Sequence, residues 1–152
     1  MSPASHVFHE IFLHINWHCH DDRPLIKSAA EAPLHDLIEE YCRKYRGVYF
    51  NRSGGTDTHV HLLVQVEPTV CPSDLIGKVK GFSAHEMNKR TGARDLKWQK
   101  GYGVVSFAKK NLPGLIGYVE NQKEHHRTGA VRDTLERWSV DVEEGVYRPP
   151  AD

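Results

Sequence analysis

The sequence predicts an α+β fold: a ferredoxin-like antiparallel sheet in the order βαββαβ, with helices on one face and an added C-terminal helix. Three observations predict it. Runs with strand character and runs with helical periodicity alternate along the chain. Two of the β-rich runs flank a pair of glycines, as in a hairpin. The 152 residues, 39% hydrophobic and 26% charged, fit a single globular domain, and no repeat or second domain is visible.

The first half of the chain supplies three strands and one helix. Residues 6–17 are rich in Ile, Val, Phe and Trp, which is typical of a strand. Residues 29–46 carry apolar side chains at spacings of three and four, which predicts a helix with one buried face. Residues 48–52 and 58–66 are β-rich runs on either side of Gly54 and Gly55, and they predict a hairpin.

The second half supplies a helix, a strand and the added helix. Residues 72–90 have an apolar side and open with Pro, Ser and Asp, as helices do. Residues 96–108 predict a last strand or a short strand pair that glycines bend. A third helix is expected from residue 111, where Asn caps and Pro follows. We expect one domain over residues 1–128 and a partly disordered extension over residues 129–152, with Pro149 and Pro150 in a frayed tail.

Composition excludes several classes of protein. The chain has no apolar run of 18 residues and no basic-then-apolar N-terminal segment, so we expect neither a membrane span nor a signal peptide, and a cytoplasmic location. Its three cysteines, Cys19, Cys42 and Cys71, are odd in number and far apart. This pattern favours reduced thiols over a disulfide framework or a CxxC zinc site.

Positive charge is concentrated in one segment although the formal net charge is zero. Residues 78–110 carry nine basic and two acidic side chains. Helical spacing predicts that Lys78, His85 and Lys89 form an outward stripe. Such a segment can bind a phosphate backbone, and it can equally be a solvated surface. Trp98, between basic neighbours, can stack on a base or pack in the core, and the sequence leaves both readings open.

Two histidines in a strand are the first candidate for chemistry. His59 and His61 are two residues apart, so on a strand both imidazoles point to one side and could bind one metal ion. They lie in an apolar run, where an unpaired imidazole would be costly. A second such pair, His18 and His20, lies beside acidic residues where solvent is the expected neighbour. The alternative for His59 and His61 is a buried pair without function.

The third helix carries the second candidate. Tyr118 and Gln122 are four residues apart and therefore share a helix face, on the flank of its apolar stripe. His125 lies beside them, and His126 is closer to the core side. For Tyr118 alone, the alternative is an amphipathic residue at the boundary of the core.

Together these segments resemble the HUH-class single-tyrosine transposases of small insertion sequences. The segments are HVHLLV, LIGKVKGFSAHEMN, WQKGYGVVSF and YVENQKEHH, in this order, and the resemblance covers about residues 6–127. It implies that Tyr118 is the nucleophile and that His59, His61 and Gln122 hold a divalent ion, Mg²⁺ or Mn²⁺. Relatives commonly have an acidic residue directly before the first histidine, whereas here Thr58 separates Asp57 from His59.

The resemblance also implies substrate and partners. Such an enzyme cleaves and rejoins single-stranded DNA at insertion-sequence ends through a 5′-phosphotyrosine, recognises DNA hairpins, and acts in the prokaryotic nucleoid as a homodimer whose tyrosine helix works in trans. Another HUH nickase, such as a replication initiator or relaxase, or a domesticated hairpin-binding protein is the alternative. The residues expected to contact DNA are Lys78, Lys80, Lys89, Arg90, Lys97, Trp98 and Lys100.

Overall fold

A four-stranded antiparallel sheet forms the centre of the computed structural model, which describes residues 6–138. The strand order is β2-β3-β1-β4, and each neighbouring pair is antiparallel. This is the ferredoxin-like arrangement, so the predicted fold class is confirmed. The strands are β1 (Ile11–His18), β2 (Val48–Gly55), β3 (His59–Val66) and β4 (Gly103–Phe107).

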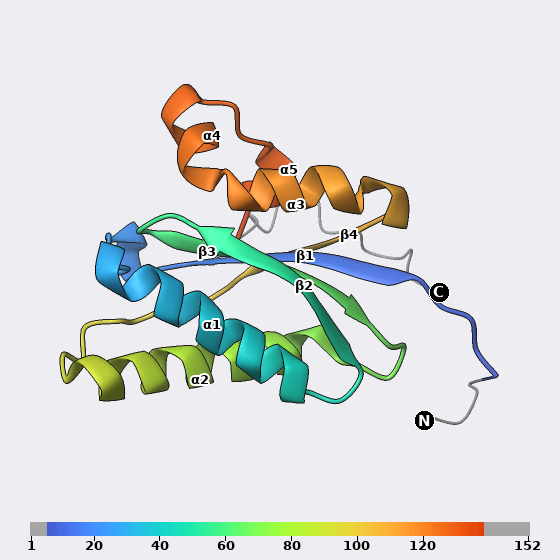
Figure 1. The fold of residues 1–152 in the computed structure, drawn as a ribbon, viewed down its shortest axis with the longest axis horizontal. Helices are drawn as coiled ribbons and strands as arrows, with labels where there is room; N and C mark the ends of the chain where they lie inside the picture. Colours follow the sequence, from blue (N-terminus) through green and yellow to red (C-terminus); the bar gives the residue numbers. More distant parts are fainter. Residues whose placement is uncertain (1–5, 139–152) are drawn as a thin grey trace, which may run out of the picture.

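Helices cover both faces of the sheet (Figure 1). One face carries α1 (Ser28–Lys44) and α2 (Pro72–Thr91), as expected. The other face carries α3 (Leu112–Glu120), α4 (Gln122–Thr128) and α5 (Asp133–Glu136). Two short 3₁₀ turns, η1 (His20–Asp22) and η2 (Lys109–Asn111), complete the described elements. None of the helices between residues 6 and 138 has the length and apolar character needed to cross a membrane.

Alternation along the two central strands separates an apolar core from a polar layer. Side chains of β1 and β3 that point toward α1 and α2 belong to the main core: Leu13, Ile15, Trp17, Val60, Leu62 and Val64. The intervening side chains point toward α3, α4 and α5, and they include four histidines and an asparagine: His14, Asn16, His18, His59 and His61. Both sets are buried because both faces of the sheet are covered.

Two glycines allow the layer of α3, α4 and α5 to lie close to the sheet. A Cβ atom at Gly54 in β2 would overlap the backbone carbonyl of Val119 in α3, and one at Gly103 in β4 would overlap that of Arg137. Leu135 of α5 packs with Leu63 and Leu115 in a second apolar cluster. The backbones of α3 and of the segment around α5 therefore sit against the sheet at fixed points.

The structure differs from the sequence-based expectations in two places. The expected third helix is two helices, because Asn121 leaves helical geometry at φ −107° and ψ 30°. The last strand is confined to Gly103–Phe107, and Trp98 forms only an isolated bridge with Cys19. Beyond residue 128, α5 docks on β1 and β4. Residues 139–152, including Pro149 and Pro150, lie outside the described residues.

Candidate functional site

The site begins with the two histidines of β3. His59 and His61 are 2% and 0% exposed, and both point toward the layer of α3, α4 and α5. Burial, reinforced by neighbouring histidines, lowers the pKa of His59 to about 3, and burial also lowers the pKa of His61. Both imidazoles are therefore neutral near pH 7, which is the form that binds a metal ion.

Neighbouring side chains fix the orientation of both rings. His61 Nδ1 lies 2.8 Å from His14 Nε2 on β1, within hydrogen-bond distance. His59 Nδ1 lies 3.0 Å from the hydroxyl oxygens of Thr56 and Thr58. With each Nδ1 engaged, each Nε2 faces the site, as in metal centres where outer partners orient the ligating histidines. Thr58, which stands where relatives commonly have an acid, has this orienting role, whereas the Asp57 side chain is exposed.

Tyr118 and Gln122 reach the same place from either side of the helix break. Both are buried, at 3% and 1% exposed, although Tyr118 was expected at the flank of the apolar stripe. Gln122 Nε2 donates to the carbonyl of Tyr118 at 3.0 Å, and this bond turns Gln122 Oε1 toward His59 Nε2 at 3.3 Å. The Tyr118 ring lies 6.0 Å from the ring of His61. The structure therefore brings the four expected site residues together.

Two further residues join this group that the sequence reasoning did not assign to it. His126 Nε2 lies 3.2 Å from Gln122 Oε1, one helical turn after Gln122. Glu136 Oε2 lies 3.2 Å from His61 Nε2, 3.4 Å from His126 Nε2 and 3.6 Å from His59 Nε2. His59, His61, His126 and Glu136, called here the donor cluster, offer ligand atoms that all lie within 4.8 Å of one another, and they could hold a metal ion.

Glu136 also contacts the hydroxyl of Tyr118. Tyr118 donates to Glu136 Oε1 at 2.6 Å and accepts from the backbone N–H of Arg132 at 2.9 Å. Burial and the bond to Glu136 raise the pKa of Tyr118 to about 12. Burial favours a neutral Glu136, but its contacts with His61 and Tyr118 outweigh burial and lower its pKa to about 2. The site thus holds a protonated phenol on a carboxylate that also faces the histidines.

The second histidine pair behaves differently from the expectation. His18 is only 9% exposed, not solvated, because β1 is covered on both faces and pairs His18 with His59. Its ring stacks on that of His59 at 4.8 Å, and its Nδ1 lies 2.7 Å from Asp22 Oδ1. His20 has turned away into η1 and pairs with Asp21. His18 therefore lies beside the donor cluster, whereas His20 does not.

Most of the residues expected to contact DNA are exposed, but two are engaged within the fold. Lys80 Nζ donates to the carbonyls of Gln99 and Gly101 at 2.8 and 2.9 Å. Trp98 Nε1 donates to the carbonyl of Lys80 at 2.9 Å, and the Trp98 ring packs edge-on against Trp17. These contacts favour a structural role for both. The exposed residues of the set are Lys78, Lys89, Arg90, Lys97 and Lys100.

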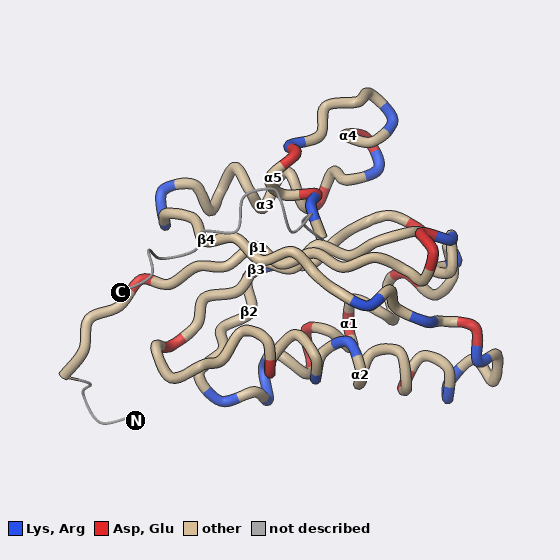
Figure 2. The backbone as a smooth tube through the Cα atoms, turned by 180° about the vertical axis from the view of Figure 1, so that it is seen from behind, with Lys and Arg blue, Asp and Glu red and all other residues tan. Residues whose placement is uncertain are grey.

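The basic positions of α2 lie on the side of the sheet opposite the donor cluster. Figure 2 shows lysines and arginines along α2 with acidic positions between them, and others in the layer of α3 and α4. Lys78 pairs with Asp74 at 3.2 Å. The charge is therefore less polarised than the sequence indicated. α2 lies on the opposite face of the sheet from α3, the helix that contains Tyr118 (Figure 1).

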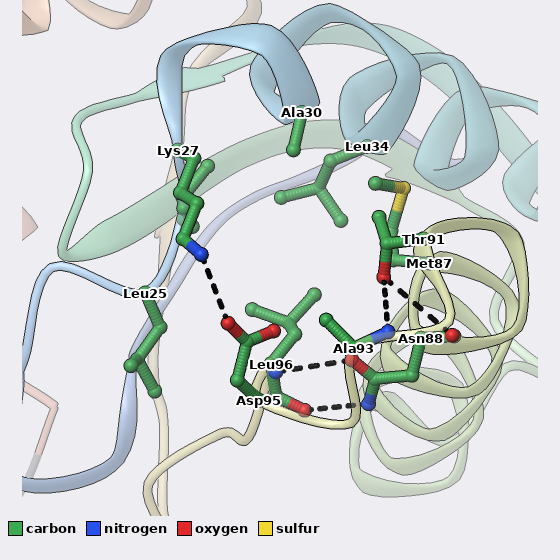
Figure 3. A pocket seen from close by; sticks show the side chains of 11 residues that line it. Leu25, Lys27, Ala30, Leu34, Met87, Asn88, Thr91, Ala93, Asp95 and Leu96 are labelled. Carbon is green, nitrogen blue, oxygen red and sulfur yellow. Dashed lines mark hydrogen bonds and ion pairs between the residues drawn. The ribbon is translucent and has the colours of Figure 1, made fainter.

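A small apolar cavity lies between α1 and the C-terminal end of α2 (Figure 3). Leu25, Leu34 and Met87 line it, and an ion pair between Lys27 and Asp95 at 3.2 Å closes one side. Its volume of about 80 Å³ is far below the several hundred Å³ that are usual for ligand sites. The cavity lies on the α1 and α2 side of the sheet, whereas the donor cluster lies on the other side.

Comparisons with known proteins agree with this fold. The family model described as "Transposase IS200 like" matches residues 7–122. A candidate transposase from Deinococcus radiodurans R1 superposes with a TM-score of 0.63 at 19% identity, covering 80% of this chain and 98% of that one. A REP-associated tyrosine transposase bound to a REP hairpin superposes with a TM-score of 0.57 at 13% identity, covering 86% of this chain and 76% of that one. No curated protein sequence matches the chain.

Proposed function

Because the chain belongs to the IS200-like transposase family, we propose that it cleaves and rejoins single-stranded DNA at insertion-sequence ends with Tyr118 as nucleophile. This proposal depends on one observation: the carboxylate of Glu136 contacts both Tyr118 and the two neutral histidines, His59 and His61. Glu136 lies 2.6 Å from the Tyr118 hydroxyl through one oxygen, and 3.2 Å from His61 Nε2 through the other. A nucleophile beside a site for a divalent ion is the arrangement that phosphoryl transfer needs.

In this proposal the metal ligands and the nucleophile are different residues. His59, His61 and Gln122 offer two imidazole nitrogens and an amide oxygen to a divalent ion, Mg²⁺ or Mn²⁺ in the simplest case. When bound, this ion would polarise the scissile phosphate. Tyr118 needs such help, because a phenol whose pKa is raised to about 12 is protonated at neutral pH. Glu136 Oε1 accepts the hydrogen bond of this phenol and so orients the phenol oxygen beside the donor cluster.

The proposed reaction conserves the number of phosphodiester bonds. The Tyr118 oxygen loses its proton and forms a bond to phosphorus while the bond to the 3′-oxygen breaks, and the leaving 3′-oxygen gains a proton, so that no net proton is released. The products are a 5′-phosphotyrosine and a free 3′-hydroxyl. A later 3′-hydroxyl attacks the phosphotyrosine, releases Tyr118 and joins a new strand. No nucleotide cofactor is needed, since the phosphotyrosine preserves the bond energy.

Tyr118→Phe tests the nucleophile directly. We expect the variant to keep the fold and DNA binding and to lose the covalent adduct completely, because only the attacking oxygen is removed. The measurement incubates the protein with Mn²⁺ and labelled single-stranded hairpin DNA and detects a denaturant-resistant protein–DNA adduct. Tyr49→Phe is the matched control, since Tyr49 is exposed and bonds only Glu67 among the described residues.

The outcomes of this assay distinguish the proposed function from its alternatives. An adduct of normal yield in Tyr118→Phe would remove Tyr118 from the mechanism. Tight hairpin binding without any adduct in the unmodified protein would favour the alternative of a hairpin-binding protein that does not cut. Cleavage without rejoining would favour a nickase.

We place the proposed chemistry within one chain. Tyr118 lies beside the histidines of its own sheet, which supports action in cis, whereas the family resemblance implied a homodimer with action in trans. Mixing Tyr118→Phe with a His59→Ala, His61→Ala double variant separates the two. Action in cis predicts that the mixture forms no adduct. Adduct formation by the mixture, with neither variant active alone, would show that the tyrosine serves a partner.

A further inference from the structure

The donor atoms around His59 and His61 have the spacing of ligands around one ion. Ligands bound at about 2.1 Å from an ion lie roughly 3.0 to 3.4 Å apart when adjacent. Here, Glu136 Oε2 is 3.2, 3.4 and 3.6 Å from the Nε2 atoms of His61, His126 and His59. Gln122 Oε1 is 3.3 and 3.2 Å from those of His59 and His126. The four ligand atoms of the donor cluster all lie within 4.8 Å of one another, and Gln122 Oε1 lies beside two of them.

Two of these atoms are buried in an arrangement that hydrogen bonding does not explain. Within residues 6–138, His61 Nε2 and Glu136 Oε2 are buried and face each other at 3.2 Å, but neither has a hydrogen bond of good geometry. Leaving a buried nitrogen and a buried carboxylate oxygen unsatisfied costs free energy. A cation bonded to both atoms would satisfy both at once. This is an independent indication that the group is a metal site.

The segment that carries Glu136 is held in place by dedicated contacts. The side-chain amide of Asn16 on β1 donates to the carbonyls of Leu135 and Arg137, at 3.0 and 2.9 Å. Leu135 is buried in the apolar cluster with Leu63 and Leu115. Gly103 leaves room for the backbone at Arg137. The residues on either side of Glu136 are thus fixed to the sheet, and the carboxylate is directed at the histidines.

We propose that His126 and Glu136 complete the metal site begun by His59 and His61, and that the resulting set of three imidazoles and one carboxylate selects a transition ion such as Zn²⁺, Co²⁺ or Mn²⁺ over Mg²⁺. The selection follows from ligand chemistry: imidazole suits transition ions, whereas Mg²⁺ prefers oxygen ligands and retains several waters. The inference rests on the metal site of the proposed function, and it changes which ion that site takes. Gln122 Oε1, which lies beside His59 and His126, would be a fifth donor to the same ion.

Metal binding by the full chain without DNA tests this inference. Thermal unfolding and titration calorimetry are measured with Zn²⁺, Co²⁺, Mn²⁺ or Mg²⁺ as the chloride salt, and the visible absorption of bound Co²⁺ reports nitrogen ligation. We expect the transition ions to raise the unfolding temperature at concentrations where Mg²⁺ does not. His126→Ala and Glu136→Gln should each weaken Co²⁺ binding at least about tenfold. The His59→Ala, His61→Ala double variant gives the background from the other histidines.

Matched controls come from the same elements. His125→Ala changes the neighbouring residue of α4, and Asp133→Asn changes a carboxylate of α5 that bonds Arg137. Both should bind Co²⁺ as the unmodified chain does. Unchanged Co²⁺ affinity and spectrum in His126→Ala and Glu136→Gln would overturn the proposal, as would equal stabilisation by Mg²⁺ and Zn²⁺. Because no DNA is present, a failure here is distinct from loss of the tyrosine adduct, which would instead contradict the proposed cleavage reaction.

Discussion

Gln122 is the residue whose surroundings say most about its role. It is buried, its Nε2 is bonded to the carbonyl of Tyr118, and its Oε1 faces two histidine nitrogens. A glutamine has no acid–base chemistry at neutral pH, so its use in such a place must be structural or ligating. The bond to Tyr118 fixes the amide to the backbone of the proposed nucleophile.

Replacing Gln122 by Ala separates these roles. If the amide oxygen is a ligand, Gln122→Ala should weaken metal affinity and slow cleavage, with partial rescue at high Mn²⁺. Gln122→Glu should retain the metal and still slow cleavage, because it adds negative charge near the phosphate. Cleavage rate is measured against Mn²⁺ concentration for each protein. Superimposable curves for Gln122→Ala and the unmodified chain would show that Gln122 is not a ligand.

Sequence patterns identified part of this site. Strand alternation predicts that His59 and His61 share a face. A spacing of four puts Tyr118 and Gln122 on one helix face, and the family resemblance implies their roles. The polar residues of β1 also follow a pattern: His14, Asn16 and His18 alternate with apolar residues in one strand. This alternation indicates that they share one face of the sheet. Glu136 carries no comparable signal. Its position depends on the docking of α5 onto β1 and β4, and no periodicity encodes such a contact.

At the scale of elements, the contact between α3 and β2 controls where Tyr118 sits. Gly54 is opposite His61 in the β2–β3 pairing, and the carbonyl of Val119 lies directly over it. A side chain at Gly54 would push α3 away from the sheet. Since Val119 follows Tyr118 in α3, the same displacement would move Tyr118, the proposed nucleophile, away from the sheet.

Gly54→Ala should therefore destabilise the fold by about 1 to 3 kcal/mol, as overpacking typically does, and should reduce adduct formation. The free energy of unfolding is measured by denaturant titration. Gly77→Ala in α2 is the matched control, because nothing lies within 4 Å of the added methyl group. It should stabilise the protein by up to about 1 kcal/mol through helix propensity. Equal behaviour of the two variants would contradict the close packing of α3.

The elements themselves were largely predictable, and their ends were not. Apolar spacing identified α1 and α2, and residues 48–52 and 58–66 form the expected hairpin. The break at Asn121 was not expected, because the residues on both sides are compatible with one helix. It lies between Tyr118 and Gln122, and the break still leaves both facing β3. Local propensity does not encode a break of this kind.

At the scale of the whole molecule, the sheet separates two groups of residues for which we propose different functions. The outward stripe of α2, with Lys78 and Lys89 exposed, is on one side, and the donor cluster is on the other. If α2 binds the DNA backbone, Lys78→Glu with Lys89→Glu should flatten the salt dependence of binding. Each lost phosphate contact lowers the log–log slope by about 0.7 for single strands.

The measurement is affinity for a single-stranded hairpin at several salt concentrations. Arg43→Glu with Lys44→Glu is a matched pair on α1, where both side chains pair with glutamates, and it should leave the slope nearly unchanged. An unaltered slope in the α2 variant would mean that the stripe is only a solvated surface.

The placement of α2 and Tyr118 on opposite faces also sets a mechanical requirement on the substrate. A strand that touches both must turn around an edge of the sheet, within a domain whose radius of gyration is about 14 Å for its size. Duplex DNA stays straight over about 150 base pairs, and forcing it through so tight a turn costs several kcal/mol. A single strand bends there at little cost. The layered fold would then discriminate by stiffness, accepting the flexible strand and rejecting the rigid duplex before any base is read.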